Sequence, residues 1–308
     1  MKILIMGTGG VGGYYGGLLA QQGNEVTFIA RGAHLYAIRH EGLKIKSVHG
    51  DFHVFPANAT DDPINVGPVD LILFCVKTYH TEAAAQAIRP AVGHRTVVMS
   101  LQNGVDAAEQ IGSTVGTEHV VGGVTWLSSA VEEPGVIKQI SQFRRIVFGE
   151  LDGSRSERIQ AIYEVLEQTG VTVEISEEIQ KVLWTKLVFI TAASSVGSLT
   201  RLPMGDYRAI PETRSLLASI MREVESLARA QNVNLDADVV EKWLEFIDNA
   251  APSIKPSMQL DVEGGHRTEL ESMIGVVGRK GRELGIPTPV SDIVYAALLP
   301  VEKKARGE

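Results

Sequence analysis

The sequence is short of cysteine and has no dense run of basic residues, and both shortages narrow the classes of protein to which it can belong. Cys75 is the single cysteine among 308 residues, so no disulfide can form within the chain. Its apolar neighbours at residues 71–76 predict a packed strand residue rather than a reactive thiol. The formal net charge is −8, so we expect no binding to nucleic acid or to an anionic membrane surface. Small metabolites are the partners that this composition favours.

Signals for export, membrane insertion and metal binding are also missing. The apolar run at the N-terminus is too short for a secretory signal, and residues 186–199 are apolar but too short to cross a bilayer. We therefore expect a cytoplasmic protein. The eight histidines form no credible ligand cluster, because His49 and His53 lie in a strand-like stretch where a spacing of four does not make side chains converge. No metal site is predicted.

Glycine is plentiful, and the most informative of the 31 glycines open the chain. A buried-strand pattern at residues 2–6 leads into the letters GTGGVG, after which a helix pattern and a second strand pattern at residues 25–30 follow. This order predicts a dinucleotide-binding turn whose helix N-terminus faces the pyrophosphate. No Walker lysine follows the turn, so the phosphate expected there belongs to a cofactor. The residues expected to bind it are Gly7, Thr8, Gly9, Gly10, Val11 and Gly12.

Arg31 follows the second strand, where an NAD site would have an acidic residue to bind the ribose hydroxyls. Its planar guanidinium can pair with a 2′-phosphate and stack on the adenine face. NADP(H) is therefore favoured over NAD(H). The alternative interpretation is an exposed loop arginine, since surface arginines are common.

Strand and helix patterns alternate over the first 150 residues, which predicts a doubly wound parallel sheet. Further strands are expected at residues 69–76, 96–101, 136–140, 145–149 and 171–175, and helices at residues 81–88, 105–111 and 157–168. From residue 177 the pattern is helical almost throughout, and Pro211 stands at a plausible first helical position. We therefore predict a Rossmann-type α/β dinucleotide-binding domain at residues 1–176 and an all-α domain at residues 177–308. Residues 303–308 are expected to form a short solvated tail.

Polar residues follow two of the expected strands, at the edge of the sheet where ligands gather in open α/β folds. Lys77 comes after residues 69–76, and Asn103 comes after residues 96–101. The Asn103 side chain could bind a nicotinamide or a polar group of a substrate. A solvated strand end and a common Asn-Gly turn remain the alternatives for these two positions.

Together these segments resemble the ketopantoate reductases, which belong to a group similar to the 6-phosphogluconate dehydrogenases. The GTGGVG turn, Arg31, CVKT with Lys77, LQNG with Asn103, LWTKL with Lys186 and RTEL with Glu269 occur in the family's order over nearly the whole chain. The resemblance implies reduction of a 2-oxo acid to a 2-hydroxy acid by NADPH. The reaction most directly implied converts 2-dehydropantoate (ketopantoate) to (R)-pantoate in pantothenate biosynthesis, on the coenzyme A pathway. Arg31 and Lys77 match residues that the family uses around the adenosine phosphate.

The resemblance also implies roles for individual residues in the helical domain and beside it. Lys186 would donate the proton to the developing alkoxide, and a cationic amine that stabilises negative charge as it forms suits that role. Asn103 would hold the nicotinamide and the lysine in register. Glu269 would accept hydrogen bonds from a hydroxyl of the cofactor or the substrate. Ser257 matches a serine that contacts the substrate.

The chain departs from the family pattern at positions where asparagines are expected. The residues found there are Ile190, Ser194, Met204 and Ile274. A spacing of four places Lys186, Ile190 and Ser194 on one helix face, so we expect the last two to contact the substrate. Losing a buried amide partner costs about 1–3 kcal/mol, enough to change substrate preference toward branched or aromatic 2-oxo acids. Arg201 could then bind the substrate carboxylate.

Two further alternatives remain open on the sequence. A sensor that binds NADP(H) without turnover would not need Lys186 and Glu269, so their presence favours an enzyme. A homodimer through the helical domain is the other open point, because the apolar stripes at residues 273–277 and 293–298 can pack internally or against a second copy.

Overall fold

The computed structural model describes residues 1–308, which divide into two compact units. Unit 1 comprises Met1–Gln102 and Asp106–Ile179, and unit 2 comprises Asn103–Val105 and Gln180–Glu308. The chain thus passes into the helical unit at Gln180, close to the boundary expected at residue 176. Three residues that follow a strand of unit 1 also group with the helices of unit 2, which local sequence patterns did not indicate.

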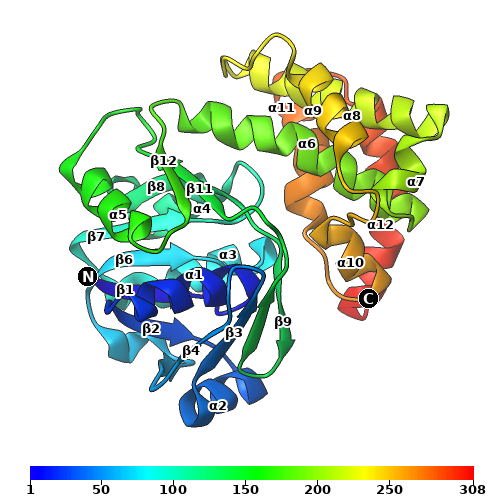
Figure 1. Ribbon diagram of the computed structural model, residues 1–308. Helices are drawn as coiled ribbons and strands as arrows, with labels where there is room; N and C mark the ends of the chain where they lie inside the picture. The colour runs from blue at the N-terminus through cyan, green and yellow to red at the C-terminus, as the bar shows by residue number, and fades with distance from the viewer. The chain divides into compact units, whose positions relative to one another are not determined.

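Unit 1 is built on an eight-stranded sheet with the strand order β12-β11-β8-β7-β6-β1-β2-β5. Its strands are β1 (Lys2–Met6), β2 (Glu25–Ile29), β5 (Asn58–Thr60), β6 (Val69–Phe74), β7 (Val92–Ser100), β8 (Val120–Trp126), β11 (Arg145–Gly149) and β12 (Thr172–Ile175). Neighbouring strands are parallel except for β8 and β11. The α/β fold is therefore confirmed. Because β1 lies between β2 and β6 (Figure 1), the winding of the sheet reverses beside β1.

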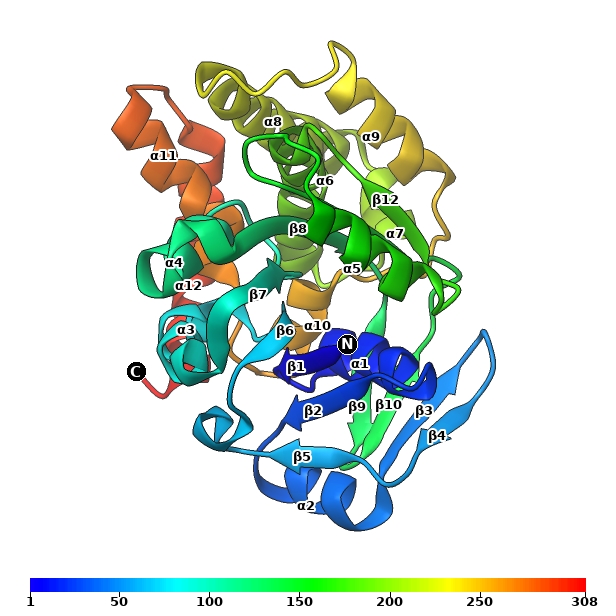
Figure 2. The same cartoon turned by 90° about the vertical axis from the view of Figure 1, so that its left-hand side faces the viewer.

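Helices cover both faces of this sheet, which explains why the buried parts of its central strands are continuous apolar runs, such as residues 71–74 of β6. Ile3 and Ile5 pack in one core with residues of α1 and α5, whereas Leu4 and Met6 pack in another core with residues of α3 and α4. At one end of the sheet α2 packs beside β5 (Figure 2). The helices are α1 (Gly10–Gln21), α2 (Gly32–Glu41), α3 (Thr81–Ile88), α4 (Ala107–Val115) and α5 (Glu157–Glu167), with short 3₁₀ turns η1 (Pro63–Val66), η2 (Thr78–His80), η3 (Arg89–Ala91) and η4 (Thr117–His119).

A second, four-stranded sheet packs on α1, and the strand expected at residues 136–140 belongs to it. Its order is β4 (Phe52–Val54), β3 (Leu43–Ser47), β10 (Val136–Gln139) and β9 (Ser129–Glu133). Glycines let α1 fit between the two sheets. A Cβ atom at Gly16 would lie 2.7 Å from Ile5 of the large sheet, and one at Gly13 would lie 2.7 Å from Ile137 of the small sheet.

Unit 2 is helical throughout and has its own apolar core. Its elements are α6 (Ile179–Thr200), α7 (Met204–Arg208), α8 (Pro211–Ala230), α9 (Val239–Asn249), α10 (Ser257–Glu263), a π-helical turn η5 (Glu271–Gly275), α11 (Val276–Leu284) and α12 (Pro289–Arg306). Pro211 opens α8 as expected. The tail expected from residue 303 is helical as far as Arg306, and none of its residues is buried, so its exposure to solvent is as expected.

The helix α6 is the core helix of unit 2. Its 22 residues are long and apolar enough to cross a membrane by length and composition, yet 67% of its most apolar window is buried inside the protein. The apolar stretch noted at residues 186–199 is thus part of a longer helix. Burial accounts for its apolar character, since Leu187 and Val188 are no more than 1% exposed in the core of unit 2.

The first of the two apolar stripes considered for a dimer lies inside unit 2. Met273, Ile274, Val276 and Val277 are at most 1% exposed and belong to its core. The stripe on α12 is mixed, because Val294 and Leu298 are buried whereas Ile293 is 71% exposed. A homodimer through the helical domain stays a prediction.

Candidate active site

The glycine-rich turn of unit 1 presents an open helix N-terminus. Gly7 has a φ of 99°, which favours glycine, and the backbone N–H and hydroxyl of Thr8 both donate to the carbonyl oxygen of Ile29, at 3.0 and 2.9 Å. No side chain caps the helix α1, and its first turn holds no acidic residue. Its first backbone N–H groups therefore remain available to an anion.

Two glycines of this turn show that it fits the pyrophosphate of a dinucleotide. A Cβ atom built at Gly9 meets no atom within 4 Å, so the space before the helix N-terminus is open. A Cβ atom at Gly12 would lie 2.1 Å from the carbonyl oxygen of Gly7, so this glycine is required for packing of the helix against the turn. Gly9 thus leaves room for phosphate, while Gly12 shapes the turn that would hold it.

The sheet order places Arg31 and Lys77 on either side of the turn. Arg31 follows β2 and is the exposed N-cap residue of α2, and Lys77 follows the strand β6. Val76 packs directly on the turn, with its backbone nitrogen 2.9 Å from a Cβ atom built at Gly7. Because β2 and β6 are the two neighbours of β1, these basic residues lie at the same edge of the sheet as the glycines.

His34 binds the glycine-rich turn, and the sequence analysis did not identify it. Its Nδ1 accepts a hydrogen bond from the backbone N–H of Gly135 at 3.0 Å, so Nε2 carries the proton and donates to the carbonyl oxygen of Thr8 at 2.8 Å. Burial lowers the pKa of His34, which favours the neutral ring that this arrangement needs, although the bond to Thr8 acts in the opposite direction. His34 thereby links the turn to α2 and to the connection between β9 and β10.

Three residues that the sequence analysis singled out form a hydrogen-bonded group in unit 2. The Nζ atom of Lys186, on α6, donates to Oδ1 of Asn103 at 2.9 Å. The Nδ2 atom of Asn103 in turn lies 3.4 Å from Oε2 of Glu269, to which it donates. The amide therefore presents its oxygen to the ammonium and its NH₂ group to the carboxylate, which is the orientation that both partners require.

Asn103 reaches this group through a sharp turn of the chain after β7. Gly104 has a φ of 95°, and a Cβ atom built on it would lie 3.1 Å from the carbonyl oxygen of Ser272. The Asn-Gly pair is thus a turn, as its alternative interpretation held, and it also places the amide beside Lys186 and Glu269.

The surroundings of Lys186 adjust its proton affinity. Burial lowers the pKa of Lys186 from 10.5 to about 8, because a charged ammonium is disfavoured away from water, and the charge of Glu269 opposes this shift. At neutral pH the lysine is therefore mostly protonated but loses its proton more readily than an ordinary lysine. A group with a pKa close to the working pH is suited to donate and recover a proton during a reaction.

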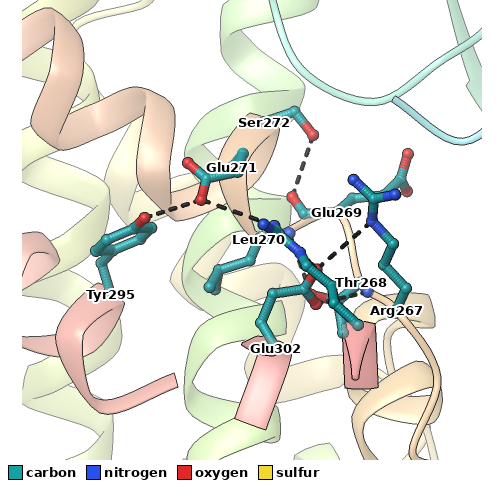
Figure 3. Close-up of polar contacts among 9 residues, drawn as sticks. Arg267, Thr268, Glu269, Leu270, Glu271, Ser272, Tyr295 and Glu302 are labelled. Atoms are coloured by element: carbon teal, nitrogen blue, oxygen red, sulfur yellow. Dashed lines mark hydrogen bonds and ion pairs between the residues drawn. The ribbon is translucent and has the colours of Figure 1, made fainter. Parts of the chain in front are cut away.

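Glu269 is almost fully buried, at 6% exposed, and its backbone leads into the π-helical turn η5. Its carbonyl oxygen accepts hydrogen bonds from the hydroxyl of Ser272 at 3.1 Å (Figure 3) and from the backbone N–H of Met273 at 3.0 Å. Turns of this type are rare in proteins and frequent at functional sites.

Comparison with known proteins places the chain in a family. The sequence-family model described as "Ketopantoate reductase PanE/ApbA" matches residues 3–153. The family model for the C-terminal part of the same proteins matches residues 178–302. The chain belongs to the ketopantoate reductase family. Members of this family are oxidoreductases that act on 2-oxo and 2-hydroxy acids.

Relatives in the ketopantoate reductase family match along their whole length. The uncharacterized oxidoreductase YkpB of Bacillus subtilis is 31% identical over 97% of this chain and 98% of its own. A 2-dehydropantoate 2-reductase of Mesorhizobium japonicum is 28% identical over 98% and 99% of the two chains. The crystal structure of a PanE/ApbA family ketopantoate reductase from Ralstonia eutropha JMP134 is 32% identical and superimposes with a TM-score of 0.92, covering 99% of this chain and 100% of that one. The fold described above is thus the family's fold.

The positions where this member of the ketopantoate reductase family lacks asparagines differ in their surroundings. Met204 and Ile274 are fully buried in the core of unit 2, so they contribute packing. Ile190 is partly buried, one helical turn from Lys186. Ser194 is also fully buried, and its hydroxyl finds no hydrogen-bond partner in the protein.

Ser257 and Arg201 were the remaining residues expected at the substrate. Ser257 is the exposed first residue of α10. Arg201 follows the end of α6, fifteen residues beyond Lys186, which corresponds to about 22 Å of helix rise. The charge of Arg201 acts on Glu263 of α10. The hypothesis that Arg201 binds the substrate carboxylate stays a prediction.

Proposed function

We propose that this protein is an NADPH-dependent 2-oxo acid reductase that converts 2-dehydropantoate to (R)-pantoate, as in pantothenate biosynthesis. The observation that supports this function most directly is the group formed by Lys186, Asn103 and Glu269. It combines a proton donor with a lowered pKa, an amide that orients it and a carboxylate that orients the amide. Full-length similarity to proteins named 2-dehydropantoate 2-reductase supports the choice of substrate.

Each residue of this group has a distinct part in the proposed reaction. When bound, the reduced nicotinamide would supply a hydride to the ketone carbon of the substrate. Lys186 donates a proton from Nζ to the ketone oxygen, where negative charge develops in the transition state. Asn103 fixes the direction of the ammonium through its Oδ1 atom. Glu269 binds the Nδ2 atom of Asn103 and so prevents the amide from turning.

The activity is expected to fall at alkaline pH, because Lys186 must be protonated to donate. Its pKa of about 8 predicts that kcat/KM for reduction is steady near neutral pH and declines above about pH 8. Oxidation of the 2-hydroxy acid needs the neutral amine and should increase through the same pH range. Steady-state rates in both directions across the neutral and alkaline range test this. A reduction rate that stays constant well above pH 8 would assign proton donation to another group.

Arg31 is the residue expected to select NADPH. Replacing Arg31 with alanine should raise the Kd of NADPH by about 10- to 100-fold, the contribution of a hydrogen bond to a charged group, and leave the Kd of NADH nearly unchanged. Titration of each cofactor against the purified protein, followed by fluorescence, measures both constants. Arg95→Ala is a matched control, because Arg95 is an exposed arginine in the first half of β7, toward the amino ends of the parallel strands. Equal losses for the two cofactors would contradict a 2′-phosphate contact.

A second candidate substrate class is a branched or aromatic 2-oxo acid, and Ile190 is the observation that favours it. This apolar side chain is one helical turn from Lys186, on the same side of α6. Oxidation of NADPH with ketopantoate and with a panel of bulkier 2-oxo acids separates the two candidates, and the same panel repeated with NADH tests the cofactor. Turnover of ketopantoate supports the proposed reaction, whereas turnover of the bulkier acids alone supports the second. Tight NADPH binding with no turnover of any acid would favour a sensor.

A further inference from the structure

Glu302 is a buried carboxylate that the proposed reaction does not use. It lies on α12 and is 1% exposed. Its Oε2 atom accepts hydrogen bonds from the backbone N–H of Thr268 at 2.7 Å and from the Thr268 hydroxyl at 2.6 Å (Figure 3). Its Oε1 atom accepts from Nε of Arg306 at 2.7 Å and lies 3.8 Å from Nε of Arg267. Burying a carboxylate is costly unless such partners are present.

The two oxygens of Glu302 have different kinds of partner. Oε1 faces the guanidinium groups of Arg306 and Arg267, which balance its charge. Oε2 faces two neutral donors that belong to a single residue, Thr268, which is itself 4% exposed. If the carboxylate needed only a balance for its charge, the two arginines would be sufficient. The second oxygen fixes both the backbone and the side chain of one residue.

That residue immediately precedes Glu269. The carbonyl oxygen of Glu269 itself accepts hydrogen bonds from Ser272 and Met273 in the turn η5, which follows it in the chain. The backbone of Glu269 is therefore held on both sides, by α12 before it and by η5 after it. From this position its side chain meets Asn103, which binds Lys186.

We infer that Glu302 is a positioning residue for the group of Lys186, Asn103 and Glu269. It binds Thr268 through two donors and so holds the backbone from which the Glu269 carboxylate reaches Asn103. The effect on turnover rests on the proposed function, whereas the effect on the lysine does not. Glu269 is the charge that acts on the ammonium, and it raises the pKa of Lys186 against the effect of burial.

The sharpest test changes the hydroxyl of Thr268 alone. Thr268→Val keeps the size of the side chain and the charges of Glu302, Arg306 and Arg267. It removes the hydroxyl donor to Glu302 and leaves the backbone donor, and Thr268→Ser keeps both donors. In Thr268→Val we expect the pKa of Lys186 to fall by about one unit, the lower end of what a nearby opposite charge contributes, and kcat to fall by about tenfold. Thr268→Ser should restore both values. Tyr295→Phe is the matched control, because it removes a neighbouring hydroxyl that donates to Glu271 at 2.8 Å (Figure 3).

The proton affinity of Lys186 can be followed without any substrate. The rate at which an amine-reactive reagent labels Lys186, measured by mass spectrometry over a range of pH, gives a midpoint for each variant. We expect the midpoint of labelling to lie near pH 8 in the wild type, in Thr268→Ser and in Tyr295→Phe. In Thr268→Val it should lie at a lower pH. Equal midpoints in all four proteins would overturn the inference. So would a shift of equal size in Thr268→Val and Tyr295→Phe, because it would show a general loosening of the fold.

Glu302→Gln provides a second measurement. The amide keeps the size of the side chain but loses the charge that Arg306 and Arg267 balance, so a larger decrease in the labelling midpoint is expected than in Thr268→Val. If Glu302→Gln does not fold, Thr268→Val decides the question alone. If the wild type reduces no 2-oxo acid, the proposed function fails while the labelling midpoints still test the role of Glu302.

Discussion

Replacing Lys186 with alanine should lower kcat for 2-oxo acid reduction by about 10³-fold, within the range that a positioned general acid contributes. The ammonium is the proton donor of the proposed reaction, and Asn103 directs it through a 2.9 Å hydrogen bond. The glycine turn that would hold the dinucleotide belongs to the other unit of the chain. NADPH should therefore bind to the variant with a Kd close to that of the wild type. Single-turnover rates and cofactor titration measure the two effects separately.

A lysine on the same helix provides the control for this substitution. Lys181 is also on α6 and forms an ion pair with Asp236 at 2.8 Å, outside the group around Asn103. Lys181→Ala should keep kcat near the wild-type value. If Lys186→Ala retained wild-type turnover, another group would be the proton donor. If it lost NADPH binding instead, Lys186 would have to be assigned to the cofactor.

Two glycines of the turn should give opposite results when each is replaced with alanine. In Gly12→Ala the new methyl group would lie 2.1 Å from a backbone oxygen, so we expect a loss of about 1–3 kcal/mol in the free energy of unfolding together with loss of NADPH binding. In Gly9→Ala the methyl group enters open space, and the φ of −79° and ψ of −162° suit any residue. The Tm should stay unchanged while the Kd of NADPH rises by about tenfold or more, since the methyl group occupies space intended for phosphate.

Thermal unfolding without cofactor and titration with NADPH distinguish these two outcomes. Each variant is the control for the other, because both add one methyl group to the same turn. Wild-type affinity in Gly9→Ala would place the pyrophosphate elsewhere. A large decrease in Tm for the same variant would show that Gly9 is needed for folding, contrary to the open space around it.

Patterns confined to neighbouring residues predicted much of unit 1. The helix α3 and the strand β11 occupy the predicted residues 81–88 and 145–149. Both faces of the large sheet are covered, so the buried stretches of its strands are apolar and can be recognised locally. Of the small sheet only the strand at residues 136–140 was predicted, because the pairing of its strands is distant in sequence. Lys44 of β3 pairs with Val136 of β10, β4 has only three residues, and β9 is largely exposed. Local periodicity cannot show such a pairing.

The candidate site was predictable only in part. Asn103 was singled out by its place after an expected strand, whereas Lys186 and Glu269 were singled out only because their segments resemble those of a family. Composition alone favours a surface role for a lysine and a glutamate. Glu302 was missed because it precedes two lysines near the C-terminus, where a solvated charge is the usual interpretation. Its burial depends on packing between α12 and the segment around Thr268, 34 residues earlier. His34 is similar, since both partners of its ring lie elsewhere in the chain.

The three residues Asn103–Val105, which join the helical unit although the chain reaches them from β7, have a consequence for recombination. Consider a chimera that fuses the first 179 residues of one relative to the remaining residues of another. Its site would combine the Lys186 and Glu269 equivalents of one parent with the Asn103 equivalent of the other. The residues of this site therefore come from two separate segments of the chain. To transfer the whole site from one relative to another, recombination needs two further crossovers, one on each side of this tripeptide, besides the fusion between the units. This requirement favours divergence of the whole gene over exchange of its halves.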